Sequence, residues 1–221
     1  MIYDGSKEIE MIYDGNKELV AVYDGSTIVW ENNKIINLSS GKSWNIQSLY
    51  PNLYSKITID NFFYLNFDQV SGSDSVTWPG YDVYLNIIGS LVKKYESGTF
   101  TSNHFHNSNQ SNVTPVIVLK PEKLIELGSG QSFDVKSKVT NYQSLTTDNF
   151  LIDAEPSNTY VYRGSRTYAG TWTAQSTRSF TKSYNASTGI LTCYFREQGS
   201  TNSGESWNNT SDVTVYLNPK V

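Results

Sequence analysis

The strongest constraint on the fold of this chain is an internal duplication that covers most of its length. Residues 34–48, KIINLSSGKSWNIQS, align without a gap on residues 123–137, KLIELGSGQSFDVKS. After a slip of one residue, the segments 54–65 and 142–152 share a tyrosine, a threonine and the triplet Asp-Asn-Phe. Similar segments that recur in the same order predict two copies of one structural unit.

The two predicted copies span residues 34–121 and 122–221, with the boundary at Pro121. The chain contains 16 Tyr, 9 Phe and 5 Trp residues, and its apolar segments alternate with short runs of Ser, Asn and Gly. This composition predicts a succession of short strands. The expected fold is therefore all-β, with an N-terminal antiparallel meander followed by two tandem homologous β-sandwich domains. Immunoglobulin-like and jelly-roll topologies both fit the pattern.

Residues 1–33 carry a shorter repeat, in which Tyr-Asp-Gly begins at Tyr3, Tyr13 and Tyr23. Asp-Gly predicts a tight hairpin turn because glycine accepts the positive φ that such turns need. The spacing predicts a continuous meander with strands near 1–3, 7–13, 17–23 and 27–33.

Apolar residues occur on both faces of this predicted meander, so its surface must be covered. It is either a cap on its own chain or an assembly and docking element, and the regular spacing favours the second interpretation. The residues predicted to make the assembly contacts are Tyr13, Leu19, Val22, Tyr23 and Trp30.

The residue types that support catalysis or metal binding are present but not in a diagnostic pattern. Asp60 and Asp148 belong to the repeated Asp-Asn-Phe triplet, which predicts a turn before a strand. His104 and His106 share one strand face, although two ligands alone do not make a metal site. Cys193 is the single cysteine, so an intrachain disulfide is excluded, and its apolar surroundings predict a buried thiol. We expect no enzymatic activity, no metal and no cofactor.

Aromatic residues near glycine, proline and asparagine are the clearest functional signal. An exposed aromatic ring packs on the C–H face of a sugar, while neighbouring amides and carboxylates bind its hydroxyl groups. In the alternative interpretation, Trp78 and Tyr168 close the ends of the two sandwiches. The predicted carbohydrate-binding residues are Trp78, Tyr81, Tyr168, Trp172 and Trp207.

The formal net charge is -4, and basic residues are scattered rather than clustered. This distribution argues against nucleic acid as a partner and against a polybasic membrane patch. The N-terminus lacks the basic start and apolar core of a signal peptide, and no apolar run is long enough to insert in a membrane. The expectation is synthesis in a cytoplasm without export.

The segments IYDGNKELVAVYDGSTIVW and LGSGQSFDVKS with YQSLTTDNFLI resemble repeated units of tail and baseplate-associated structural proteins of bacteriophages that infect Gram-positive hosts. The resemblance implies a virion component made in the host cytoplasm. It also implies a homo-oligomer or contacts with other virion proteins, and a host cell-surface polysaccharide as ligand. The alternatives are a free-standing tandem carbohydrate-binding module and a fragment of a bacterial surface adhesin.

Overall fold

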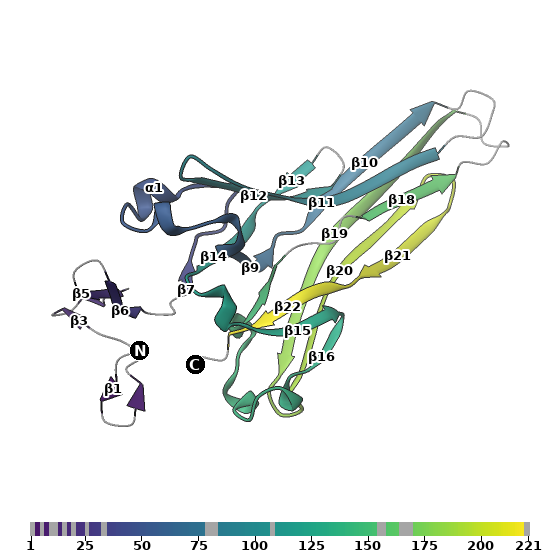
Figure 1. Ribbon diagram of the computed structural model, residues 1–221. Coiled ribbons are helices and arrows are strands. Elements are labelled where there is room, and N and C mark those ends of the chain that lie inside the picture. Colours follow the sequence, from purple (N-terminus) through teal and green to yellow (C-terminus); the bar gives the residue numbers. More distant parts are fainter. Residues whose placement is uncertain are drawn as a thin grey trace.

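The structure is a computed structural model that describes residues 3–4, 7–8, 13–14, 17–18, 21–24, 27–31, 35–77, 84–106, 109–153, 158–163 and 170–218. Most of these residues lie in antiparallel strands (Figure 1), which confirms the all-β prediction. The one α-helix among them is the short α1 (Ile46–Leu49), which Asn45 caps by accepting a hydrogen bond from the Ser48 amide.

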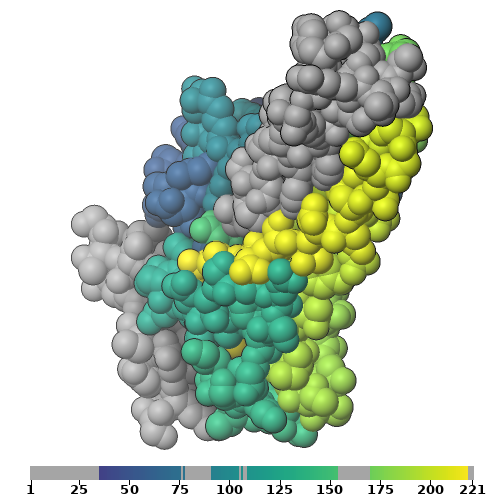
Figure 2. Space-filling model, turned by 90° about the vertical axis from the view of Figure 1, so that its right-hand side faces the viewer, coloured from purple at the N-terminus to yellow at the C-terminus, as the bar shows by residue number. Residues whose placement is uncertain are grey.

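The largest sheet contains three strands from each copy of the repeat. Its central contact joins β17 to β9, where Ile152 pairs with Tyr64. In the space-filling view, the yellow band that contains residues 213–217 runs beside the teal segment that contains residues 125–130, with which it pairs (Figure 2). The order of the six strands is β15 (Ile125–Gly130), β22 (Val213–Leu217), β17 (Phe150–Ile152), β9 (Phe62–Phe67), β14 (Val113–Val118) and β7 (Ile35–Asn37).

Two further sheets each hold one strand donated by the other copy. The first has the order β10 (Val70–Thr77), β19 (Thr171–Asn185), β20 (Ile190–Thr201), β16 (Ser132–Asp134), with β21 (Ser206–Ser211) also paired to β20. The second has the order β13 (Asn109–Ser111), β12 (Thr99–His106), β11 (Tyr84–Glu96), β18 (Asn158–Arg163), with β8 (Ser43–Asn45) also paired to β12. Strand β10 of the first copy therefore extends the sheet of the second, and β18 of the second copy extends the sheet of the first.

The prediction of two separate sandwiches at 34–121 and 122–221 is wrong, because the copies exchange strands and share one core. Phe62 and Phe100 of the first copy belong to the same buried cluster as Phe150 and Phe195 of the second. Alternation of apolar and polar residues predicts that a segment is a strand, but it does not name the partner strand. The choice of partner depends on contacts between the copies, which the alignment of one copy on the other does not contain.

The duplicated sequence does give duplicated local structure. The Thr58 amide donates a hydrogen bond to Asn61 Oδ1 at 2.8 Å, and the Thr146 amide donates to Asn149 Oδ1 at 2.8 Å. Each asparagine thereby closes a 3₁₀ turn, η2 (Ile59–Asn61) or η6 (Thr147–Asn149), immediately before a buried phenylalanine. The prediction that the Asp-Asn-Phe triplets are turns is confirmed.

Two more 3₁₀ turns match in the same way, η1 (Tyr54–Lys56) and η5 (Tyr142–Ser144). The Tyr95 hydroxyl donates to the Tyr54 carbonyl at 2.9 Å, and the Tyr184 hydroxyl donates to the Tyr142 carbonyl at 2.7 Å. The other 3₁₀ turns in the described residues are η3 (Pro121–Lys123) at the boundary between the copies and η4 (Val135–Ser137). The matched turns and strands therefore follow in the same order in each copy, with α1 of the first copy at the position that η4 occupies in the second.

The N-terminal repeat forms hairpins, as the Asp-Gly turns predict. In the strands described before residue 35, pairing is found within each hairpin, while residues 9–12 and 19–20, which would join neighbouring hairpins into the predicted meander, lie outside the described residues. The pairs are β1 (Tyr3–Asp4) with β2 (Lys7–Glu8), β3 (Tyr13–Asp14) with β4 (Lys17–Glu18), and β5 (Ala21–Asp24) with β6 (Thr27–Glu31).

Figure 1 draws these hairpins outside the sheets of the sandwich. Of the predicted assembly residues, Leu19 lies outside the described residues. Tyr13, Val22, Tyr23 and Trp30 lie in β3, β5 and β6, where the backbone alone is described.

The exchange of strands predicts that one copy does not fold alone. In a fragment of residues 122–221, β19 loses the eight residue pairs that it makes with β10, and β17 loses its contact with β9. We expect this fragment to be unfolded or to form a homodimer that restores the exchange, whereas residues 35–221 fold. Circular dichroism and sedimentation velocity distinguish these outcomes, and a folded monomeric fragment would contradict the prediction.

Candidate functional site

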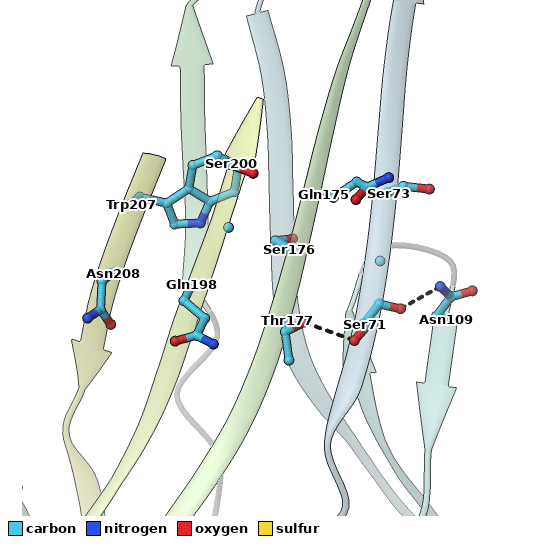
Figure 3. A pocket seen from close by; sticks show the side chains of 12 residues that line it. Ser71, Ser73, Asn109, Gln175, Ser176, Thr177, Gln198, Ser200, Trp207 and Asn208 are labelled. Carbon is cyan, nitrogen blue, oxygen red and sulfur yellow. Dashed lines mark hydrogen bonds between the residues drawn. The ribbon is translucent and has the colours of Figure 1, made fainter. Parts of the chain in front are cut away.

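A groove of about 720 Å³ lies on the sheet of β10, β19, β20 and β21, with Asn109 of β13 at one side. Figure 3 shows the side chains that line it, which come from these five strands. Besides Asn109, the lining consists of Ser71, Gly72, Ser73, Gln175, Ser176, Thr177, Gln198, Gly199, Ser200, Trp207 and Asn208.

Strand alternation places the polar side chains of the groove on the face of the sheet that points away from the core. Ser71 and Ser73 are exposed, whereas Gly72 between them is buried, and Gln175 is exposed beside the buried Ser176. The strand register then arranges the exposed side chains in two rows across the sheet. One row contains Ser71, Thr177, Gln198 and Asn208, and the other contains Ser73, Gln175, Ser200 and Ser206.

Apart from Trp207, the described side chains that line the groove are uncharged hydroxyl and amide groups. The Ser71 and Thr177 hydroxyl groups are hydrogen-bonded at 2.9 Å, and Asn109 Nδ2 donates to the Ser71 carbonyl at 2.6 Å. Within the described residues, the amides of Gln175, Gln198 and Asn208 make no side-chain hydrogen bond to the protein. These three amides can therefore donate to a ligand and accept from it.

A buried polar cluster lies on the opposite face of the same strands. The indole Nε1 of Trp207 donates to Glu197 Oε1 at 3.4 Å, and His106 Nε2 lies 3.6 Å from the same oxygen. His106 Nε2 also contacts the Ser176 hydroxyl. Arg178 is fully buried beside them, with its guanidinium carbon 5.2 Å from the centroid of the Phe195 ring.

Two glycines make room for this cluster. A Cβ atom at Gly199 would overlap the Trp207 ring and the Gln175 carbonyl, and one at Gly72 would lie 2.9 Å from His106 Cδ2. Larger residues at these positions would therefore displace the groups that support the groove from below.

His106 and Glu197 occupy equivalent positions in the two copies. The equivalent tyrosines Tyr95 and Tyr184 pair with Phe100 and Leu191, and six residues further along each strand lie His106 and Glu197. The equivalent strands β12 and β20 thus contact each other through the core at equivalent positions. One of these positions carries the base His106 and the other carries the acid Glu197.

Burial raises the pKa of Glu197 above its ordinary value of 4.5. Hydrogen bonds from Trp207 and Ser176 and the charges of Arg178 and His104 act in the opposite direction but do not cancel the effect of burial. The folded protein therefore holds this proton to a higher pH than an exposed glutamate does.

The cluster contains a serine, a histidine and a glutamate but not the geometry of a catalytic triad. In such a triad, the histidine contacts the nucleophile through one ring nitrogen and the acid through the other. Here Ser176 and Glu197 both contact Nε2 of His106. Ser176 is also only 4% exposed. This arrangement does not support nucleophilic catalysis by Ser176.

The predicted pairing of His104 and His106 on one strand face is present, and both side chains are buried. His104 Nδ1 lies 2.9 Å from the Asp68 carbonyl oxygen. Among the described residues, no group of three or more His, Cys, Asp or Glu side chains is arranged to hold a metal ion. Cys193 is buried as predicted, and burial raises its pKa to about 12.

The structure separates the predicted carbohydrate-binding aromatic residues. Trp172 is fully buried on the core side of β19 and donates to the Ser203 hydroxyl at 2.9 Å, so its prediction as a sugar platform is wrong. Trp207 is partly exposed and lines the groove. Trp78, Tyr81 and Tyr168 lie outside the described residues.

The two polar rows were not predicted from the sequence, although a signal for them was present. The segments SGSDSVT and TAQSTRS place Ser, Thr or Gln at every second position, with few charges. Such alternation indicates an uncharged sheet face rather than a loop.

Comparisons with known proteins identify no relative of this chain. The sequence matches no protein-family model, and no curated protein or solved structure shows significant similarity to it. The described residues include no helix that is long and apolar enough to cross a membrane.

The raised pKa of Glu197 predicts how the E197Q variant responds to pH. The folded chain holds this proton to a higher pH than the unfolded chain does. The stabilising contribution is therefore complete below about pH 4.5 and is lost as the pH rises through the raised pKa. Glutamine has no such proton to lose. The free energy of unfolding of E197Q should therefore increase relative to that of the unchanged protein as the pH rises through this range.

Urea denaturation at a series of pH values measures this difference. E205Q, which changes an exposed acid, is the matched control and should not show the same trend. Parallel pH profiles for E197Q and the unchanged protein would contradict the assignment.

Proposed function

We propose that this chain is a non-enzymatic adhesion protein of a bacteriophage particle that binds carbohydrate on the host surface. The observation that carries this proposal is the groove on β10, β19, β20 and β21, whose lining among the described residues consists of hydroxyl and amide side chains, two glycines and Trp207, with no charged side chain. Sugars present many hydroxyl groups, so such a lining matches their hydrogen-bonding capacity.

The buried cluster below the groove supports a binding function because it fixes the strands from which the groove side chains project. Ser176 and Trp207 line the groove and also contact His106 and Glu197 on the other face. A rigid site loses less conformational entropy when a ligand binds.

The N-terminal hairpins are proposed as the attachment element of the same protein. They repeat a short unit outside the sandwich, and their sequence resembles that of phage tail and baseplate-associated proteins. In this proposal they bind other copies of the chain or neighbouring virion proteins, and the sandwich carries the groove towards the host surface.

Substitutions that fill the groove test the carbohydrate-binding part of the proposal. S73R and S200R each place a long charged side chain at an exposed groove position, so they should not disturb the core. We expect each to reduce binding of the full chain to purified bacterial surface polysaccharides by about tenfold or more, because the side chain blocks the site. Glycan arrays followed by titration calorimetry measure the effect.

S183R is the matched control, because Ser183 is exposed on the same strand and face as Gln175 but lies at the other end of β19. If all three variants bind polysaccharide as the unchanged chain does, the groove is not the carbohydrate site.

Removal of residues 1–33 tests the attachment part. Their apolar side chains, when exposed together, should drive association, since each buried side chain of this size contributes about 1.5–3 kcal/mol. We expect the shortened chain to keep its far-UV circular dichroism and to have the mass of a single chain by light scattering. A full chain that is already monomeric at high concentration would contradict self-association.

A further inference from the structure

We infer that the groove binds a linear, uncharged polysaccharide whose chain runs across the strands, from β10 towards β21. This inference rests on the proposed function, because it specifies the ligand of the same groove. It assigns the recognition of that ligand to the side-chain amides of Gln175 and Gln198.

The direction follows from the register of the strands. Ser71, Thr177, Gln198 and Asn208 are direct neighbours on four successive strands, so their row runs perpendicular to the strands. Neighbouring strands lie about 4.8 Å apart, which gives the row a length of about 14 Å. The second row lies about 6.8 Å away along the strands. Two parallel rows of this length suit an extended chain of several sugar units better than one sugar ring.

Among the described residues, no charged side chain lines the groove, which indicates an uncharged ligand. The nearest buried charged groups, Glu197 and Arg178, lie on the opposite face of the sheet. Arg196 is on the same face as Gln198, but its Nη2 donates to the Tyr194 hydroxyl at 3.0 Å and its guanidinium carbon lies 5.5 Å from that ring. Arg196 is thus held beside Tyr194 and does not line the groove. An anionic polymer would lose hydration without gaining a cation in return.

Gln175 and Gln198 each carry a primary amide, which can bind the hydroxyl groups of a sugar chain. Each primary amide holds a donor and an acceptor next to each other, so it can bind two neighbouring hydroxyl groups at once. Gln175 and Gln198 project from adjacent strands into different rows (Figure 3). Because neither side chain bonds to the described part of the protein, no internal hydrogen bond is broken when the ligand binds.

Titration calorimetry of the full chain tests this inference with two sets of ligands. The first is a series of linear, uncharged oligosaccharides of glucose or N-acetylglucosamine of increasing length, and the second is an anionic polysaccharide such as alginate. We expect the affinity for the uncharged series to rise with length and then to level off, with little dependence on salt. Q175A and Q198A should each weaken binding by about three- to tenfold, since each loses hydrogen bonds to the ligand. The S183A control should bind unchanged.

The other outcomes separate the failure of this inference from that of the proposed function. If alginate binds in a salt-dependent way and S200R alters that binding, the groove is a carbohydrate site but the ligand is anionic. If a single sugar binds as tightly as the longest oligosaccharide, the inferred chain direction is wrong. If no carbohydrate binds, or if every groove substitution leaves the affinity unchanged, the inference and the carbohydrate-binding function both fail.

Discussion

The pairing of β10 with β19, and of β11 with β18, determines most of this structure. Each pair joins a strand of one copy to a strand of the other, and the first extends over eight residue pairs. With β9 and β17 also paired at Tyr64 and Ile152, every sheet of the sandwich contains both copies. The two halves therefore cannot separate without breaking backbone hydrogen bonds and exposing a shared core, which couples their folding.

A shared core places equivalent positions of the two copies in different surroundings, so they can carry different residues or make different contacts. His106 and Glu197 are one example. Lys93 and Lys182 are another: Lys93 Nζ lies 3.0 Å from Asp153 Oδ1, whereas Lys182 Nζ donates to the Phe150 carbonyl at 3.1 Å. Burial lowers the pKa of Lys182 to about 8. The same residue type thus has a carboxylate partner in one copy and a backbone partner in the other.

The local features of the fold could be predicted from sequence because their causes are local. The Asp-Gly turns and the asparagine caps at Asn61 and Asn149 depend on residues only a few positions apart. The partners of β10 and β18 depend on contacts between distant segments, which neither copy reveals alone. The same limit applies to the site: Trp172 and Trp207 each follow a glycine by two or three residues, but strand pairing buries the first and leaves the second partly exposed.

The groove itself is a consequence of the strand exchange. Ser71 and Ser73 come from the first copy, and the residues paired with them, Thr177 and Gln175, come from the second. Without the donated β10, the polar rows would end at β19, and the edge of that strand would be open. The buried polar cluster beneath the groove also contains residues of both copies, since His106 of the first contacts Ser176 of the second. A single copy would therefore lack both one side of the groove and part of the cluster beneath it, so the proposed binding face requires the duplicated chain.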